Sequence, residues 1–178
     1  VGHVAAARKA LGVRTMFNVL GPLSNPAGAK RQLMGVFARD LVRPIAEVMP
    51  HLGVARAWVV HGSDGLDELT TTGVTQVAEL KDGIVREFQV KPENAGLDPS
   101  QASDLEGGDP KENAEALRRL LKGEKSAYRD ISVLNAAAAL IVADKSEELN
   151  AAARMAEHSI DSGAAEAALE KLIAVSNS

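Results

Sequence analysis

Short apolar runs separated by glycine and proline mark the first half of the chain. The runs at residues 33–38 and 55–60 have the length of buried strands, and a helical pattern at residues 41–52 lies between them. Asp40 is placed to cap this helix and Gly53 to end it. A strand, a helix and a second strand in this order predict a βαβ unit with parallel strands and a right-handed crossover.

Two further segments rich in β-forming residues follow, at residues 75–80 and 84–90. Lys81-Asp82-Gly83 joins them, and an Asp-Gly pair between two such segments predicts a β-hairpin. Residues 90–110 are rich in proline, glycine, aspartate and serine, which is typical of a long surface connection.

The remainder of the chain has helical periodicity. Asp109 followed by Pro110 and Glu112 has the residue types of a capped helix start, and Ser126 can cap a second helix. This second helix is apolar on all sides near its centre, so we expect it deep in the core. The predicted helices are residues 109–122, 126–143 and 147–173, the last interrupted near residues 161–163.

These elements predict an α/β fold with a mostly parallel sheet, flanking helices, a β-hairpin and a helical C-terminal part. Residues 4–11 read as the end of a helix with Gly12 behind it, and residues 14–26 as a short helix or turn. The chain opens on Val1, inside this helical pattern and without a capping residue. We therefore expect residues 1–178 to form a single domain that is a fragment or a trimmed product.

Composition narrows the possible functions. Aromatic residues make up only 3% of the chain against 46% hydrophobic residues, so the core must be built from alanine, valine, leucine and isoleucine. A net charge of −4 provides no basic footprint for nucleic acid. There is no cysteine, which excludes disulfides and thiolate chemistry. The longest apolar run, residues 131–143, is too short to cross a bilayer, so we expect a cytoplasmic protein without a membrane partner.

The first candidate for chemistry is the adjacent pair Asp67 and Glu68, in a glycine-containing loop after the second predicted strand. Loops at the carboxyl ends of strands hold the ligands of open α/β sheets, and Mg²⁺ is usually held by one or two carboxylates together with substrate phosphates. The other interpretation is a solvated acidic turn. The spacing of acids excludes an EF-hand, and the four histidines lack the spacing of zinc ligands.

Three further candidates each have a structural alternative. Arg8 offers a guanidinium that can grip a carboxylate or phosphate, although an arginine in an alanine-rich helix usually faces solvent. Gly21 and Pro22 let backbone approach a ligand closely, or form an ordinary tight connection. His61 is either a general base or phosphate contact, or a structural histidine bonded to a loop carbonyl.

Three motifs together resemble the anthranilate phosphoribosyltransferase family. They are residues 8–26 (RKALGVRTMFNVLGPLSNP), residues 65–68 (GLDE) and residues 107–113 (GGDPKEN). The first motif is long and specific, and the resemblance extends from residue 4 to the end of the chain.

The resemblance implies an enzyme that couples anthranilate to phosphoribosyl pyrophosphate (PRPP) and releases pyrophosphate. It implies a helical domain beside an α/β domain, a homodimer, and bound Mg²⁺. By resemblance, Arg8 binds the anthranilate carboxylate, Gly21 and Pro22 line the anthranilate route, and Asp67 and Glu68 bind the Mg²⁺. Such a transfer requires positioning and neutralisation of the leaving charge and no protein nucleophile, which agrees with the residues present.

The family's glycine-rich pyrophosphate loop and its Lys-His-Gly-Asn motif have no counterpart in the chain. We therefore expect the N-terminal helical domain to be absent and the chain to be inactive alone. Two alternatives remain. One is an enzyme like a pyrimidine nucleoside phosphorylase, against which Arg8 and residues 17–26 argue. The other is a non-catalytic binding module of the same fold.

Overall fold

The computed structural model describes residues 17–178. The predicted helix at residues 4–11, its end at Gly12 and the candidate Arg8 lie outside this range. Within residues 17–178, four strands form one sheet: β1 (Arg31–Gly35), β2 (Arg56–Gly62), β3 (Thr75–Lys81) and β4 (Ile84–Val90). The α-helices are α2 (Phe17–Leu23), α3 (Val42–Val48), α4 (Pro110–Leu121), α5 (Ala127–Val142), α6 (Leu149–Asp161) and α7 (Ala164–Ser176).

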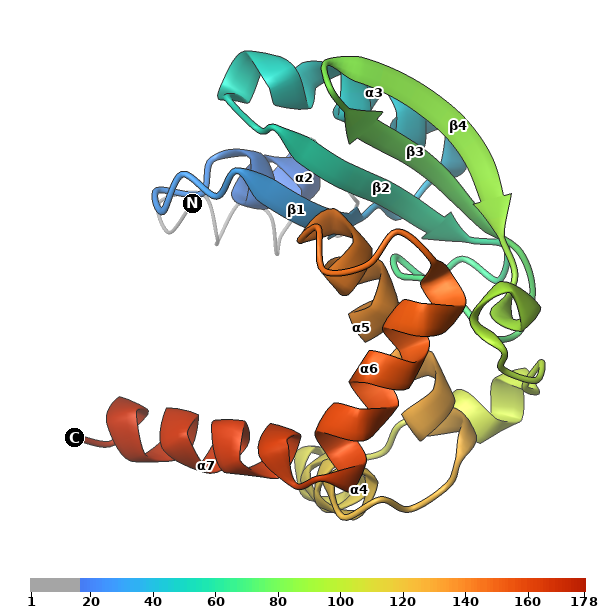
Figure 1. Cartoon of the computed structure of the whole chain (residues 1–178), viewed down its shortest axis with the longest axis vertical. Coiled ribbons are helices and arrows are strands. Elements are labelled where there is room, and N and C mark those ends of the chain that lie inside the picture. The colour runs from blue at the N-terminus through green and yellow to red at the C-terminus, as the bar shows by residue number, and fades with distance from the viewer. Residues whose placement is uncertain (1–16) are drawn as a thin grey trace, which may run out of the picture.

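The sheet is mixed, with strand order β1-β2-β3-β4 (Figure 1). Only β1 and β2 run parallel, from the pair Arg31 and Arg56 to the pair Gly35 and Val60. β3 pairs antiparallel with β2 and with β4, so the prediction of a mostly parallel sheet is wrong. The physical reason is the connection between β2 and β3, which contains no helix that could carry the chain back across the sheet.

The predicted hairpin is confirmed, and β4 has the predicted bounds. Asp82 and Gly83 both adopt left-handed backbone conformations, with φ of 53° and 74°. Two consecutive residues with positive φ give a turn whose twist matches that of the flanking strands, which is why Asp-Gly predicts it.

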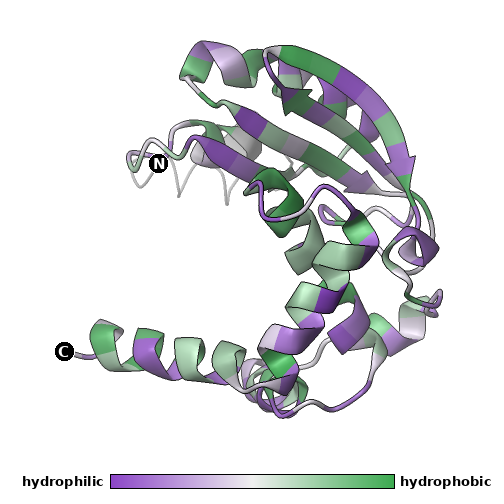
Figure 2. Cartoon of the chain, viewed as in Figure 1, coloured by the Kyte–Doolittle hydropathy of each residue, from purple (hydrophilic) through white to green (hydrophobic). Residues whose placement is uncertain are grey.

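Helices cover both faces of the sheet. On one face Ala57 and Val59 of β2 pack with α3, and on the other Trp58 and Val60 pack with α5 and α6 (Figure 1). β2 is therefore buried on both sides, which explains its continuous apolar run. The outer strand β4 carries both hydrophilic and hydrophobic residues, and most of its side chains are exposed or half-buried (Figure 2).

The helix predicted at residues 41–52 is divided into three pieces. Short 3-10 helices, Arg39–Leu41 and Met49–Leu52, flank α3. Pro50 has no N–H group to continue the α-helical hydrogen bonds. The α-helix therefore changes to a 3-10 helix at Met49, and this helix ends at Gly53. The prediction that Asp40 caps the helix is wrong, because Asp40 lies inside the first 3-10 helix and its side chain caps nothing there.

The C-terminal helices begin and end close to the predicted positions. Asp109 accepts hydrogen bonds from the N–H groups of Lys111 and Glu112, while Glu112 accepts one from the N–H group of Asp109. Ser126 caps α5 by accepting a hydrogen bond from the Arg129 N–H group. One face of α5, which includes Leu134 and Ala138, is buried in the core, whereas Ala136 and Ala139 are exposed, so the helix is not buried on all sides. The break near residue 162 separates α6 from α7, which extends away from the sheet (Figure 1).

The long connection before α4 contains two 3-10 helices, Pro92–Ala95 and Ala102–Leu105. Among residues 17–178, none of the helices has the length and apolarity needed to cross a membrane.

Candidate functional site

The acidic residues lie on the connection between β2 and β3, residues 63–74, which we call the acid loop. It begins where β2 ends, and the Gly62 N–H group donates to the Leu66 carbonyl at 2.8 Å. Its main chain also crosses the end of β1, because a Cβ atom at Gly35 would overlap the carbonyl group of Asp67. The acid loop therefore covers the carboxyl ends of the two parallel strands, which is where open α/β sheets hold their ligands.

Asp64 organises the acid loop from within. Its Oδ2 accepts hydrogen bonds from the hydroxyls of Thr70 (2.5 Å) and Thr72 (2.6 Å), and its Oδ1 accepts one from the N–H group of Leu66 (3.1 Å). Partial burial by itself would raise the pKa of Asp64, but these three donors outweigh burial and hold the pKa below its usual value. Asp64 is thus an ionised residue whose lone pairs are already engaged within the loop.

Asp67 and Glu68 are both exposed. In the described part of the chain, no lysine, arginine or histidine forms an ion pair with either carboxylate. Partial burial, followed by the negative charges of Asp67 and Asp64, raises the pKa of Glu68. The ionised form of Glu68 is therefore disfavoured in the loop, and a bound cation would stabilise it.

A cavity of about 350 Å³ opens beside the acid loop. Asp64 and Glu68 line it from the loop, Leu105 from the second 3-10 helix of the long connection, and Tyr128 and Ile131 from α5. Glu68 therefore lies at the border between exposed solvent and a partly apolar recess, which accounts for the contribution of burial to its pKa shift.

Asn135 holds the acid loop from outside. Its Oδ1 accepts a hydrogen bond from the Leu69 N–H group at 2.9 Å, and its Nδ2 donates to the Leu69 carbonyl at 2.8 Å. No role for Asn135 follows from the sequence alone. The available signal was a lone amide in the otherwise apolar centre of a predicted core helix, where a buried polar side chain needs a partner.

His61 bonds a loop carbonyl, as its structural interpretation predicts. The Nδ1 atom lies 2.8 Å from the Val36 carbonyl oxygen, directly after the end of β1. Because a carbonyl can only accept, Nδ1 carries the proton in this pair. His61 thereby ties the end of β2 to the end of β1.

Gly21 and Pro22 lie inside α2 and are exposed, so the interpretation of this pair as an ordinary tight connection is wrong. The helix continues to Leu23, since a proline near its end removes a single hydrogen bond. No hydrogen bond or ion pair in residues 17–178 connects Gly21 or Pro22 to the acid loop. Their substrate role stays a prediction, as does that of Arg8.

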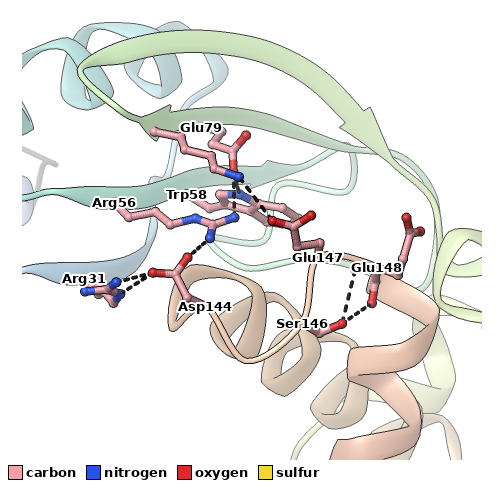
Figure 3. A network of polar contacts seen from close by, with 9 residues as sticks. Arg31, Arg56, Trp58, Glu79, Asp144, Ser146, Glu147 and Glu148 are labelled. Carbon is pink, nitrogen blue, oxygen red and sulfur yellow. Dashed lines mark hydrogen bonds and ion pairs between the residues drawn. The ribbon is translucent and has the colours of Figure 1, made fainter.

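The charges at the other end of β2 are arranged differently. Asp144, in the turn after α5, forms ion pairs with Arg31 and Arg56, and Glu79 receives Arg56 and the indole N–H of Trp58 (Figure 3). Every charged group in this network has an opposite charge within reach. In the acid loop, by contrast, the like charges of Asp67 and Glu68 have no ion-pair partner among residues 17–178.

Within residues 17–178, no three histidine, aspartate or glutamate side chains are grouped so that they could hold a metal ion by themselves. A metal ion at Asp67 and Glu68 would therefore need ligands from a substrate or solvent. This donor set suits Mg²⁺, which commonly binds through one or two carboxylates together with phosphate oxygens.

Comparisons with known proteins agree with the resemblance found in the sequence. The curated anthranilate phosphoribosyltransferase of Rhodospirillum rubrum is 60% identical over 173 residues, which are 97% of this chain and 50% of that protein. The same enzyme from Parvibaculum lavamentivorans is 59% identical over 175 residues, 98% of this chain and 51% of that protein. The chain thus spans about half the length of these curated relatives.

Solved structures give the same result. The crystal structure of anthranilate phosphoribosyltransferase from Thermus thermophilus superimposes with a TM-score of 0.88 at 43% identity, covering 97% of this chain and 51% of that one. The enzyme from Saccharomyces cerevisiae in complex with PRPP and Mg superimposes with a TM-score of 0.86 at 31% identity, covering 95% of this chain and 49% of that one.

A family model described as "Glycosyl transferase family, a/b domain" matches residues 1–166. This match includes the sheet, the acid loop and the helices that pack on it. The chain belongs to this glycosyl transferase family, as its a/b domain.

Proposed function

We propose that the chain serves an anthranilate phosphoribosyltransferase of tryptophan biosynthesis. The reaction transfers the phosphoribosyl group of PRPP to anthranilate and releases pyrophosphate. The observation that carries the proposal is the unneutralised pair Asp67 and Glu68 at the carboxyl ends of β1 and β2, in a chain 60% identical to enzymes of this activity. Support also comes from a relative with a superimposable fold, from Saccharomyces cerevisiae, that was solved in complex with PRPP and Mg.

Asp67 and Glu68 would hold Mg²⁺ in this proposal. When bound, Mg²⁺ neutralises the negative charge that gathers on the departing pyrophosphate. The residues of the acid loop keep two carboxylates adjacent, exposed and without an ion pair to any cation of residues 17–178. Asp64 would act through the geometry of the loop, because its oxygens are already bonded to Thr70, Thr72 and Leu66.

The second substrate would be recognised by its own carboxylate. In the proposal Arg8 pairs with the carboxylate of anthranilate through its planar guanidinium, and Gly21 and Pro22 line the approach of the aromatic ring. No nucleophilic side chain is assigned, because the amine of anthranilate is itself the nucleophile. The proposal includes a homodimeric complete enzyme and residues 1–178 as part of its α/β domain.

Binding is the appropriate test, because the chain spans about half the length of its relatives. Pyrophosphate is titrated into the 178-residue chain by calorimetry, with and without Mg²⁺. We expect a heat that requires Mg²⁺ and an affinity that falls about tenfold or more in Asp67→Asn and in Glu68→Gln. A wild-type chain that gives no Mg²⁺-dependent heat would contradict the proposed metal site and favour a non-catalytic module.

Glu148→Gln supplies the matched control. Glu147 and Glu148 form another adjacent acidic pair, but Glu147 has a cation within reach, since Lys81 Nζ lies 3.8 Å from its carboxylate. Removing the charge of Glu148 should leave binding of Mg²⁺ and pyrophosphate unchanged. An equal loss in all three variants would indicate nonspecific attraction of cations to an acidic protein.

A further inference from the structure

The acid pair lies between two fixed points of the main chain. On one side, the carbonyl group of Asp67 packs directly against Gly35 of β1. On the other side, Leu69 follows Glu68 immediately and is fully buried. The directions of the Asp67 and Glu68 carboxylates therefore depend on where these two main-chain segments are held and on the few torsion angles between them.

The buried Leu69 backbone needs hydrogen-bond partners, and β-sheet pairing does not supply them at this position. Leu69 lies beyond the end of β2 and before the start of β3. Both of its main-chain groups are bonded by one side chain, Asn135, at 2.9 Å and 2.8 Å. A buried peptide group without such partners is costly, so this pairing selects one position of the loop.

An asparagine is suited to this task for a specific reason. Its Nδ2 has two hydrogens, and the second donates to the Ile131 carbonyl, one turn earlier in α5, at 3.0 Å. The reversed orientation would aim the amide oxygen at two carbonyl oxygens. The side chain is therefore locked by its own helix and offers one acceptor and one donor to Leu69.

We propose that Asn135 is a positioning residue for the acid pair: by holding both main-chain groups of Leu69, it fixes the direction of the Asp67 and Glu68 carboxylates toward a shared Mg²⁺. The inference rests on the proposed function, because it assumes the metal site. It predicts that the rigid helix α5 sets the geometry of a site to which it contributes no ligand. Groups that orient metal ligands in this way typically change metal affinity when they are removed.

The test is calorimetric titration of Mg²⁺ and pyrophosphate into the 178-residue chain and three variants. Asn135→Ala removes all three hydrogen bonds. Asn135→Leu also removes them but keeps the same number and branching of side-chain heavy atoms, so it can be measured if the alanine variant does not fold. Leu134→Ala is the matched control. Leu134 is the neighbouring residue in α5 and is fully buried in the core, and its apolar side chain forms no hydrogen bond with the loop. We expect the Asn135 variants to bind about 10- to 100-fold more weakly and the control to bind like wild type.

Amide hydrogen exchange supplies a readout that does not depend on the metal. Without Mg²⁺, the Leu69 amide should exchange much faster in the Asn135 variants than in wild type or Leu134→Ala. Unchanged binding in the Asn135 variants, unchanged exchange at Leu69, or an equal loss of binding in Leu134→Ala would each overturn the inference while leaving the metal site in place. A wild-type chain without Mg²⁺-dependent binding would overturn the metal site, and the inference with it.

Discussion

The two ends of β2 handle charge in opposite ways. At the amino end, Arg56 is buried and is paired with Asp144 and Glu79 (Figure 3). At the carboxyl end, Asp67 and Glu68 stand side by side without a cation from the described part of the chain. A buried charge that lacks a partner is unfavourable, and adjacent like charges repel. The charges at the amino end are paired within the fold, whereas the repulsion between the two acids at the carboxyl end can be reduced by a bound cation.

The main chain near the two ends of β2 also places the charged side chains differently. Asp144 adopts a left-handed conformation, with φ of 57°, in the turn where its carboxylate reaches both Arg31 and Arg56. In the acid loop the polar side chains bond the loop itself, so that the two ligand candidates stay exposed. A charged residue with a structural role can thus be identified by its ion-pair partners. A candidate functional charge can be identified because its surroundings are rigid and it lacks such a partner.

The largest expected effect is that of Gly35→Ala, which pushes the acid loop away from β1. A Cβ atom at this position would overlap the Asp67 carbonyl, which is backbone and cannot rotate away. We expect a loss of about 3 kcal/mol in the free energy of unfolding and loss of pyrophosphate binding. Urea denaturation and calorimetry measure the two quantities.

Gly73→Ala is the control for that substitution. It lies in the acid loop, but its Cβ would meet the side chain of Ser63, which is exposed and can adopt another rotamer. We expect a cost below about 1 kcal/mol. Similar losses in both variants would mean that the contact with β1 is not what fixes the acid pair.

Asp144→Asn tests the balanced end of β2. Asparagine tolerates the left-handed conformation but removes the charge shared by Arg31 and Arg56. Because Asp144 is half-exposed and Arg56 keeps Glu79, we expect a loss of about 2 kcal/mol. Binding of Mg²⁺ and pyrophosphate should not change, since this network lies at the opposite end of the strand.

Asp82→Asn separates the ion pairs from the backbone conformation. Asp82 has a comparable φ of 53° in the exposed hairpin turn. We expect a change in unfolding free energy within about 0.5 kcal/mol. If Asp82→Asn destabilised the protein as much as Asp144→Asn, the network of Asp144 would have no measurable role in stability.

Thr70→Val tests the internal support of the acid loop. Valine has the shape of threonine but can neither donate to Asp64 nor accept from the Thr72 N–H group. Loss of the bond to Asp64 should move the pKa of Asp64 up toward its usual value. A carboxylate with a lowered folded-state pKa stabilises the protein above its unfolded pKa, and this contribution is lost as the pH falls through the folded pKa. We expect a cost of about 1 kcal/mol at pH 7 that shrinks below about pH 4.

Thr71→Val is the matched control for Thr70→Val. Thr71 is also fully buried, but its hydroxyl has no hydrogen-bond partner within the described part of the chain. Its replacement should be neutral or slightly stabilising at every pH, because it removes an unsatisfied polar atom. A pH-dependent loss in Thr71→Val as large as that in Thr70→Val would show that Asp64 is not the cause.

Local chemistry explains what could be predicted from the sequence. The turn at Asp82 and Gly83 and the helix start at Asp109 depend on neighbouring residues, and the structure confirms both. The direction of β3 depends on how its connection crosses the sheet, and an apolar run has the same pattern in parallel and antiparallel pairing, so the sheet was predicted wrongly. The helix break at Pro50 was missed because a proline near a helix end is often tolerated.

In the candidate site, too, features set by neighbouring residues could be predicted and long-range contacts could not. Asp67 and Glu68 could be found because adjacent acids after a strand are visible in the sequence. The clamp between Leu69 and Asn135 joins residues 66 positions apart, and no local pattern reports such a pairing. A lone asparagine in an apolar helix only indicates that some buried partner exists.

The smallest expected effect has the opposite sign and sharpens the comparison most. Because burial and the neighbouring acids raise the pKa of Glu68, its ionised form is disfavoured in the folded protein. Glu68→Gln should therefore stabilise the fold, by about 0.5 kcal/mol or less because the side chain is exposed and screened by solvent. A group with a raised folded-state pKa destabilises only while it is ionised, so the gain should vanish as the pH falls through that pKa.

Thermal unfolding of wild type, Glu68→Gln and Glu148→Gln at pH 7 measures this gain, which corresponds to a rise of about 1–2 °C for a chain of this size. Glu148→Gln should show no such rise. The same Glu68→Gln variant is expected to bind Mg²⁺ and pyrophosphate about tenfold or more weakly. A residue whose removal improves folding and impairs binding is retained for the ligand. If Glu68→Gln instead destabilised the protein, the carboxyl end of β2 would be a structural charge network like the amino end, and the contrast between the two would be lost.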